Sequence, residues 1–225
     1  MSTPTSTSTQ VEAVVFDLDG VLLDSEQVWD EIREQLVHER AGTWTDTAQR
    51  DMMGMSSPEW SRYMHDVLGL DEPPGEINAE VVRRMQDRYA RDLPLLPGAV
   101  DAVRRLAERC PLGLATSSNR PVIETVLDAA ELRPFFAATV SSEEVARGKP
   151  APDVYLEAAR RLGVDPARCA AIEDSHNGIR SARAAGMRVI AIPNAHFPPG
   201  DALREADVVA QSLDELTPEL VSPSS

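Results

Sequence analysis

The sequence is poor in positive charge. It carries 22 Lys plus Arg against 37 Asp plus Glu, which gives a formal net charge of −15. This balance argues against a protein that binds nucleic acid through the phosphate backbone, because such binding needs clustered Lys and Arg. It does not exclude a small anionic substrate, since a local site can be positive on an acidic protein. We therefore expect no nucleic-acid partner.

Cysteine and long apolar runs are also scarce. The two cysteines, Cys110 and Cys169, form neither a CxxC motif nor a Cys/His cluster, so we interpret them as small hydrophobic residues rather than a disulfide framework. No apolar run reaches the length of a membrane span, and the polar residues 1–10 lack a hydrophobic signal segment. These absences predict a cytoplasmic protein without a membrane partner, with a disordered leader over residues 1–10.

The apolar residues that are present alternate between strand and helix patterns. A length of 225 residues suits one α/β domain with an insertion, or two modest domains. Residues 11–16 are apolar and β-branched, which indicates a buried strand. Alternation of this kind implies a parallel sheet with right-handed crossovers. The later predicted strands are 112–116, 137–140, 169–172, 188–192 and 208–209, and the predicted helices between them are 99–107, 121–130, 152–162 and 177–185.

Residues 25–94 have a different pattern, with helical spacing throughout and no strand signal. Val28, Ile32 and Leu36 recur at helical spacing, and further helices are predicted over 58–68 and 77–91. We expect an all-helical insertion placed over the carboxyl ends of the strands, where open α/β sheets bind ligands. The predicted division is leader 1–10, core 11–24 and 95–215, insertion 25–94 and tail 216–225.

Pairs of acids follow two of the predicted strands. Asp17 and Asp19 come after the first, and Glu173 and Asp174 after the fourth. Carboxylates gathered at one sheet edge repel one another unless some are protonated or a cation lies between them, and Mg²⁺ prefers such oxygen ligands. One carboxylate could attack a phosphoryl group while its neighbour transfers the proton. The alternative for the first pair is two solvated turn aspartates.

Two further segments could hold phosphate. Thr116, Ser117, Ser118 and Asn119 follow the second strand, where hydroxyls and backbone N–H groups can bind phosphate oxygens; the alternative is helix capping by Ser118 or Asn119. Lys149, the single lysine of the chain, lies beside Pro150 before a helix. A lysine on such a rigid loop could pair with carboxylate and phosphate together, although it could also be a solvated surface lysine.

These segments in this order closely resemble the haloacid-dehalogenase superfamily of phosphotransferases. The matching segments are Asp17-Leu18-Asp19-Gly20-Val21, Thr116-Ser117-Ser118, Gly148-Lys149-Pro150 and Glu173-Asp174-Ser175-His176-Asn177-Gly178. The resemblance covers about residues 11–215, and the insertion after the first motif resembles subfamily I, in particular its β-phosphoglucomutase-like branch. It implies an α/β fold with a Rossmann-like parallel-sheet core and an inserted all-helical cap.

The resemblance also implies roles. Asp17 would be the nucleophile that forms an aspartyl phosphate, and Asp19 the general acid and then base. Thr116 and the Ser117 N–H, within the 116–119 segment, would hold the phosphoryl oxygens, and Lys149 would neutralise charge. Mg²⁺ would be the cofactor. Its implied ligands are Asp17, the Asp19 backbone carbonyl and Asp174, with Glu173 nearby and in contact through water.

The cap would close over a small phosphorylated metabolite and select it. The candidates for contact with this substrate are Trp29, Met53, Gly54, Met55, Ser56, Ser57 and Trp60. For Trp29 the alternative is packing inside the cap, and for Gly54-Met55-Ser56-Ser57 it is a simple turn between helices.

The resemblance leaves phosphatase and mutase as alternatives. A mutase of this branch carries a cap arginine where this chain has Ser57, and a cap histidine where it has Trp29. Both departures favour a phosphatase acting on a small phosphomonoester, a sugar phosphate first among them, although Arg62 could supply a mutase's positive charge. A phospho-receiver domain and a catalytically silent binding protein are more distant alternatives. We expect a monomer.

Overall fold

The sheet of the computed structural model contains six parallel strands in the order β3-β2-β1-β4-β5-β6. The structure describes residues 10–52, 55–194 and 198–222. The strands are β1 (Ala13–Phe16), β2 (Leu112–Thr116), β3 (Phe136–Ser141), β4 (Cys169–Glu173), β5 (Arg188–Ala191) and β6 (Val208–Val209). The predicted parallel α/β fold is therefore confirmed, and β1 and β4 lie side by side in its centre.

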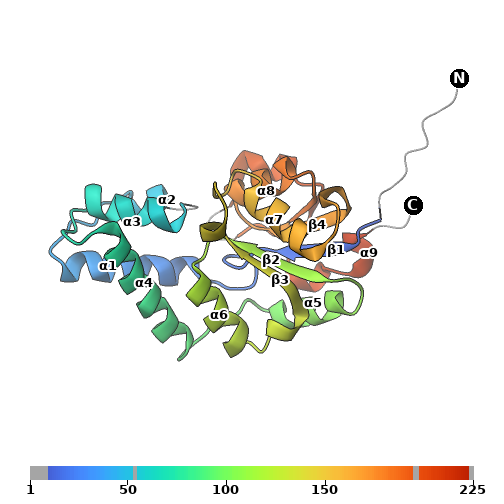
Figure 1. Ribbon diagram of the computed structural model, residues 1–225, viewed down its shortest axis with the longest axis horizontal. Helices are drawn as coiled ribbons and strands as arrows, with labels where there is room; N and C mark the ends of the chain where they lie inside the picture. Colours follow the sequence, from blue (N-terminus) through green and yellow to red (C-terminus); the bar gives the residue numbers. More distant parts are fainter. Residues whose placement is uncertain (1–9, 53–54, 195–197, 223–225) are drawn as a thin grey trace, which may run out of the picture.

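Helices cover both faces of the sheet. In Figure 1, α7 (Asp153–Leu162) and α8 (His176–Ala184) lie above the strands, while α5 (Ala99–Ala107) and α6 (Arg120–Ala129) lie below them. In β1, Val14 and Phe16 pack in the same hydrophobic cluster as α5 and α6, and Ala13 and Val15 in the cluster of α7 and α8. A strand buried on both faces reads as a continuous apolar run, which is why residues 13–16 show no polar alternation.

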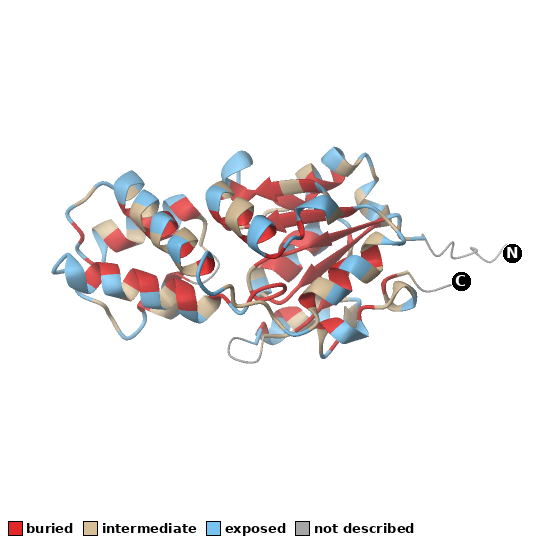
Figure 2. Cartoon of the chain, turned by 90° about the horizontal axis from the view of Figure 1, so that it is seen from below, coloured by how far each residue is buried: buried red, intermediate tan, exposed pale blue. Residues whose placement is uncertain are grey.

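The inserted all-helical cap is also confirmed. It contains α1 (Glu26–Glu39), α2 (Ala48–Met52), α3 (Ser57–Asp66) and α4 (Pro74–Tyr89), which lie to one side of the sheet (Figure 1). Buried residues line the inner sides of these helices and exposed residues the outer sides (Figure 2). The sequence missed α2, because a helix of five residues gives too little periodicity to recognise. The boundaries at residues 25 and 94 stay a prediction.

The C-terminal segment differs from the polar tail predicted from residue 216 on. Pro218–Val221 forms a short helix, α9, and Leu216 and Val221 are buried. Ser222 Oγ accepts a hydrogen bond from the Val11 backbone N–H at 3.0 Å. Short 3₁₀ turns that periodicity does not predict lie at Arg133–Phe135, Ser142–Glu144, Pro166–Arg168, Gly200–Glu205 and Leu213–Glu215.

Three other predictions concern segments outside the sheet. Residues 1–9 of the predicted leader lie outside the described residues. Within the part of the chain that the structure describes, none of the helices has the length and apolar character needed to cross a membrane. Cys169 is buried, Cys110 is half-buried, and both are free thiols.

Candidate active site

The acids after β1 and β4 meet at one edge of the sheet. Because Phe16 and Ile172 are partners in the parallel register, Asp17 and Glu173 leave their strands side by side. One carboxylate oxygen each of Asp17, Glu173 and Asp174 lies within 4.8 Å of the others, and all three residues are buried. The structure thus brings together residues from opposite ends of the sequence, as parallel strand ends require.

Gly20 allows the loop after β1 to approach Asp174. Its φ is +76°, which favours glycine, and a Cβ at this position would lie 2.0 Å from Asp174 Oδ2. No other residue has both the backbone freedom and the missing side chain that this approach needs. The glycine of the first motif therefore shapes the acid cluster directly.

Lys149 lies between two of these acids. Its Nζ is 2.8 Å from Asp17 Oδ1 and 2.5 Å from Glu173 Oε1, and its side chain is buried. Burial alone would lower the pKa of Lys149, but the charges of Asp17 and Glu173 more than offset burial and raise it. Lys149 is therefore a fixed cation beside Asp17 and not a solvated surface lysine.

Glu173 is fully occupied by hydrogen bonds. Its Oε1 accepts from Lys149 and from the Tyr155 hydroxyl at 2.6 Å, and its Oε2 accepts from the backbone N–H of Asp174 and from Ser175 Oγ. A Cβ at Gly178 would lie 1.9 Å from this carboxylate, so the start of α8 packs directly on it. The geometry thus makes Glu173 the support of Lys149, and its contact with a metal through water stays a prediction.

Ser175 joins this support to the next helix. Its hydroxyl accepts a hydrogen bond from the Gly178 N–H at 3.1 Å and so caps α8. The same hydroxyl donates to Glu173.

The Asp19 side chain points away from the acid cluster and toward the cap. Its Oδ1 accepts from Ser25 Oγ at 2.6 Å and from Trp29 Nε1 at 3.0 Å. Its Oδ2 accepts from Ser118 Oγ at 2.6 Å, with Thr116 Oγ1 at 3.4 Å. Both the core loop and the first cap helix therefore hold this carboxylate, and the first aspartate pair is not a solvated turn.

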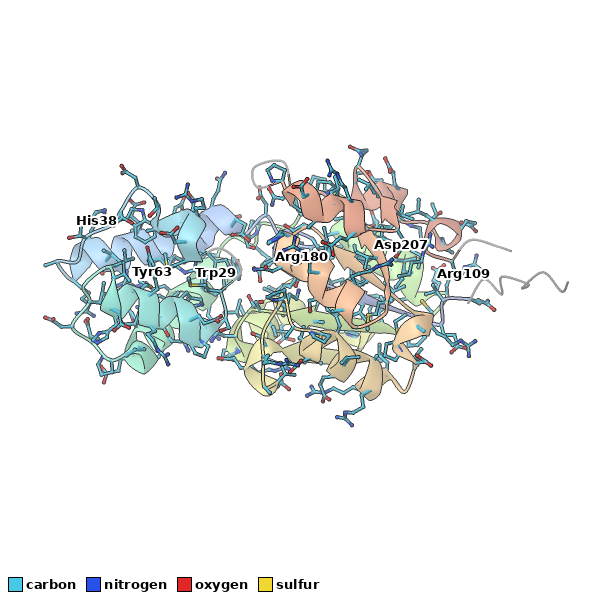
Figure 3. All side chains as sticks on the ribbon, turned by 90° about the horizontal axis from the view of Figure 1, so that it is seen from above. Trp29, His38, Tyr63, Arg109, Arg180 and Asp207 are labelled. Atoms are coloured by element: carbon cyan, nitrogen blue, oxygen red, sulfur yellow. The ribbon has the colours of Figure 1, made fainter. Side chains whose placement is uncertain are left out.

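Trp29 packs inside the cap, and its indole N–H also reaches the core. It is buried and packs against Trp60, with ring centroids 6.2 Å apart, yet its indole N–H reaches Asp19. Figure 3 shows Trp29 at the end of the cap that faces the sheet, with His38 at the opposite end. The sequence gave no signal for the Asp19 contact, because that contact depends on how the cap sits on the core.

The segment after β2 divides into two parts. Thr116, Ser117 and Ser118 line the cavity described below. Asn119 does not line it: its Nδ2 donates to Asn78 Oδ1 at 3.1 Å and to Glu143 Oε1 at 2.6 Å. Asn119 occupies the N-cap position of α6, but its side chain makes no capping hydrogen bond. In this structure Asn119 therefore links the core to α4, and its contact with phosphate stays a prediction.

A cavity of about 270 Å³ lies between the sheet edge and the cap. Core residues supply the acids, the hydroxyls and Lys149, and cap residues supply the opposite wall. The lining residues from the cap helices and the segment before α3 are Glu26, Trp29, Arg33, Arg50, Met52, Met55 and Trp60.

Some predicted cap contacts fall outside this wall. Trp29, Met55 and Trp60 line the cavity, as predicted, while Met53 and Gly54 lie outside the described residues. Ser56 and Ser57 do not line it: the Ser56 hydroxyl donates to Glu59 at 2.6 Å, and Ser57 is buried at the start of α3. Both residues lie at the start of α3, and their contact with substrate stays a prediction. Arg62 is exposed and also lies away from the cavity.

Two residues of the cap wall, Glu26 and Arg33, were not predicted from the sequence. The spacing held a signal for Arg33, since it follows Trp29 by four residues and lies on the same face of α1. Glu26, in the first turn of α1, lines the same wall.

The acid cluster has the properties of a cation site. Asp174 Oδ1 is buried and has no hydrogen-bond partner among the residues that the structure describes. Burial and the neighbouring carboxylates raise the pKa of Asp174, and burial likewise raises the pKa of Asp17 although Lys149 opposes it. Carboxylate oxygens at this spacing suit a hard cation, which would relieve their repulsion. The donor set therefore fits magnesium.

Comparison with known proteins decides the family. The model of the haloacid dehalogenase-like hydrolases matches residues 11–186. The chain belongs to this family. Hexitol phosphatase B of Escherichia coli (strain K12) is 37% identical over 218 residues, which cover 94% of this chain and 97% of that protein.

Two further relatives span nearly the whole chain. Phosphoglycolate phosphatase of Shigella boydii is 28% identical, over 96% of this chain and 94% of that protein. The crystal structure of CbbY from Rhodobacter sphaeroides in complex with xylulose-(1,5)bisphosphate is 28% identical in sequence, with a TM-score of 0.80 over 92% of this chain and 96% of that one. Each of these three matches covers at least 92% of this chain and at least 94% of the relative.

Proposed function

We propose that this hydrolase is a magnesium-dependent phosphatase that cleaves small phosphomonoesters, sugar phosphates first among them, through an aspartyl-phosphate intermediate. The observation that carries the proposal is Lys149 Nζ at 2.8 Å from Asp17 Oδ1, at the bottom of a cavity that also contains Asp19. The curated relatives named as phosphatases, which match along almost the whole chain, support it.

Asp17 would act as the nucleophile. A carboxylate oxygen attacks phosphorus while the ester P–O bond breaks, and the leaving oxygen takes a proton from Asp19. In the second step Asp19 takes a proton from water, the water oxygen attacks phosphorus, and Asp17 is released with inorganic phosphate. Asp19 lies next to Ser118 and Trp29, which orient its carboxylate toward the cavity that they also line.

The remaining core residues would stabilise charge. Lys149 reduces the repulsion between Asp17 and an incoming phosphate anion, and Glu173 holds Lys149 in place. The Thr116 hydroxyl and the Ser117 N–H would bind the phosphoryl oxygens, while the Ser118 hydroxyl donates to Asp19. Magnesium would be held by the Asp17 and Asp174 carboxylates and the Asp19 backbone carbonyl. When bound, it would neutralise negative charge on the phosphoryl oxygens.

A mutase is the second candidate, because one observation favours it. Arg33 and Arg50 line the cap wall of the cavity and could meet a second phosphate. Neither, however, stands at the position of the mutase arginine, which Ser57 occupies in this chain. The two functions differ in product: a phosphatase releases inorganic phosphate, whereas a mutase returns an isomeric sugar phosphate. The small-metabolite partner, the monomeric state and the cytoplasmic location stay predictions.

Replacing the nucleophile tests the proposal. Wild-type protein with Mg²⁺ should release inorganic phosphate from several sugar phosphates, and a chelator should stop it. Asp17→Asn should lower kcat by at least about a thousandfold, because a nucleophile cannot be partly replaced. Asp19→Asn should slow turnover and allow a phosphorylated Asp17 to accumulate, visible by mass spectrometry of the intact protein.

Asp24→Asn is the matched control. Asp24 belongs to the same segment but is exposed and does not line the cavity, so its replacement should leave kcat within twofold of the wild-type value, about the scatter of such assays. Comparable phosphate release by the Asp17→Asn protein would mean that the nucleophile lies elsewhere.

A further inference from the structure

Arg33 on α1 is a buried cation that faces the cavity. Only 9% of its side chain is exposed, and its guanidinium carbon lies 4.9 Å from the ring centroids of both Trp29 and Trp60. The two indoles hold the guanidinium through their faces, a contact that favours arginine. They do not use its N–H groups, which point along the plane of the guanidinium.

Those N–H groups lack hydrogen-bond partners among the described residues. Arg33 Nε is buried and unpaired, and the contact with Asp30 Oδ1 is long, at 3.9 Å. Leaving a buried N–H donor such as Nε without an acceptor is costly. Separately, burial lowers the pKa of Arg33 by desolvating its charge, while Asp30 and Glu26 oppose the shift. A ligand that enters the cavity would supply the missing acceptors.

Glu26 supplies acceptors on the same wall. It lines the cavity in the first turn of α1, and Arg33 is near enough to stabilise its ionised form. The cap wall therefore presents a donor group and an acceptor group together. Two neighbouring hydroxyls match this pair, because each hydroxyl both donates and accepts.

We propose that Arg33 and Glu26 bind the hydroxyl groups at the uncharged end of a sugar or polyol monophosphate. This inference rests on the proposed phosphatase function and names the substrate class for the same site. Arg33 is assigned as a specificity-determining residue, and Glu26 as its acceptor partner.

A second phosphate fits this wall less well than hydroxyls do. A phosphate offers only acceptors and brings further negative charge. On the cap wall, the charges of Glu26 and Asp30 already balance that of the buried Arg33. Arg50 adds positive charge, but 77% of its side chain is exposed, where solvent screens it. The cavity of about 270 Å³ is also below the roughly 300–1,000 Å³ of pockets for drug-sized ligands, which favours a small substrate.

Three substrates separate the contributions of the cap wall and the core. Glucitol 6-phosphate has a hydroxyl-bearing chain, ethyl phosphate has none, and fructose 1,6-bisphosphate carries a second phosphate. In Arg33→Met, the ratio of kcat/KM for glucitol 6-phosphate to that for ethyl phosphate should fall at least about tenfold, mainly through KM. Glu26→Gln should lower the same ratio by a smaller factor, since an amide still accepts a hydrogen bond.

Two further variants control for folding and charge. Arg62→Met removes an exposed arginine from the cap at a position away from the cavity, so the ratio should not change. Arg33→Lys keeps the charge but loses the planar donor group, and the ratio should fall between the wild-type and Arg33→Met values. Thermal melting of each variant shows whether the cap still folds, and the ratio is read only on folded protein.

The outcomes distinguish this inference from the proposed function. An unchanged ratio in a folded Arg33→Met protein would overturn the inference, because Arg33 would then only stabilise the tryptophan pair. If Arg33→Met lost activity only toward fructose 1,6-bisphosphate, that result would overturn the inference, because Arg33 would then bind the second phosphate. Absence of Mg²⁺-dependent phosphate release from every substrate in the wild type would overturn the proposed function itself, and the inference with it.

Discussion

Gly20 and Gly186 share a left-handed backbone but differ in what surrounds them. At Gly20, with φ +76°, a Cβ would lie 2.0 Å from Asp174 Oδ2, whereas at Gly186, with φ +79°, a Cβ would meet nothing within 4 Å. The cost of a side chain at each position can therefore be separated into backbone strain and contact with the acid cluster.

We predict that Gly20→Ala destabilises the protein by about 2–4 kcal/mol, the sum of backbone strain and a forced shift of Asp174. Gly186→Ala should cost only the strain, about 1–2 kcal/mol. Urea unfolding of both variants in a chelator checks this. Equal costs would mean that the loop after β1 relaxes away from Asp174.

Glu26 is a carboxyl with a raised pKa. Burial raises its pKa from 4.5 to about 7; the charge of Asp19 adds to this shift, and that of Arg33 opposes it. Ionising this carboxyl is harder in the folded chain than in the unfolded one, so its contribution to stability is full below pH 4.5 and is lost as the pH rises through about 7. Glu26→Gln cannot ionise. The free energy of unfolding of Glu26→Gln, taken relative to that of the wild type, should therefore rise by at most roughly 3 kcal/mol from pH 5 to pH 8.

Urea unfolding of the wild type and Glu26→Gln at the two pH values, in chelator, measures this difference. The same stability difference at pH 5 and at pH 8 would contradict a buried Glu26 carboxyl.

Among the helices, α3 shows why a motif in a cap loop need not contact substrate. Both the backbone N–H and the hydroxyl of Ser56 donate to the Glu59 carboxylate, at 2.8 and 2.6 Å, which fixes the first turn of α3. Pro58 within that turn already has the φ that a helix needs. The serine that sequence reasoning assigns to substrate binding therefore begins a helix.

We predict that Ser56→Ala lowers the stability of the protein by about 1 kcal/mol, the usual cost of losing such a helix-terminal hydrogen bond. KM for the best sugar phosphate should stay at the wild-type value. A thermal melt and a Michaelis curve check both halves. A KM raised several-fold at unchanged stability would restore Ser56 to the substrate site.

At the scale of the whole molecule, the acid cluster joins parts of the chain that only the fold brings near. Asp17 follows β1 and Asp174 follows β4, so an ion held by both binds the folded chain and not the unfolded one. Binding of this kind stabilises the native state by mass action.

We predict that Mg²⁺ at about 100 times its Kd raises the stability of the protein by about 2.7 kcal/mol, which corresponds to a Tm increase of about 5–10 °C for a chain of this size. Calorimetry with Mg²⁺ and with chelator measures the shift, without any substrate. Asp174→Asn should remove most of it. A shift of equal size in that variant would place the ion elsewhere.

The sequence predicted most of the fold because its signals are local. The buried run before Asp17 and the apolar runs before Thr116 and Glu173 each specify their own strand. Parallel topology then follows from the alternation, and it places every residue after a strand at one edge. Helix ends were less accurate: α4 begins at Pro74 and not near Ile77, because the first turn of a helix tolerates proline.

From the sequence alone, Asp17 and Asp174 are expected at the carboxyl edge of the sheet, because both come directly after predicted strands. The folded structure added the neighbours: Lys149 lies beside Asp17, Asp19 turns to Trp29, and Asn119 turns to Asn78. Hydrophobic periodicity shows which face of a helix is buried but not which element packs against it, so it cannot show how the cap packs on the core. That packing places the unpaired donors of Arg33 at the cavity wall.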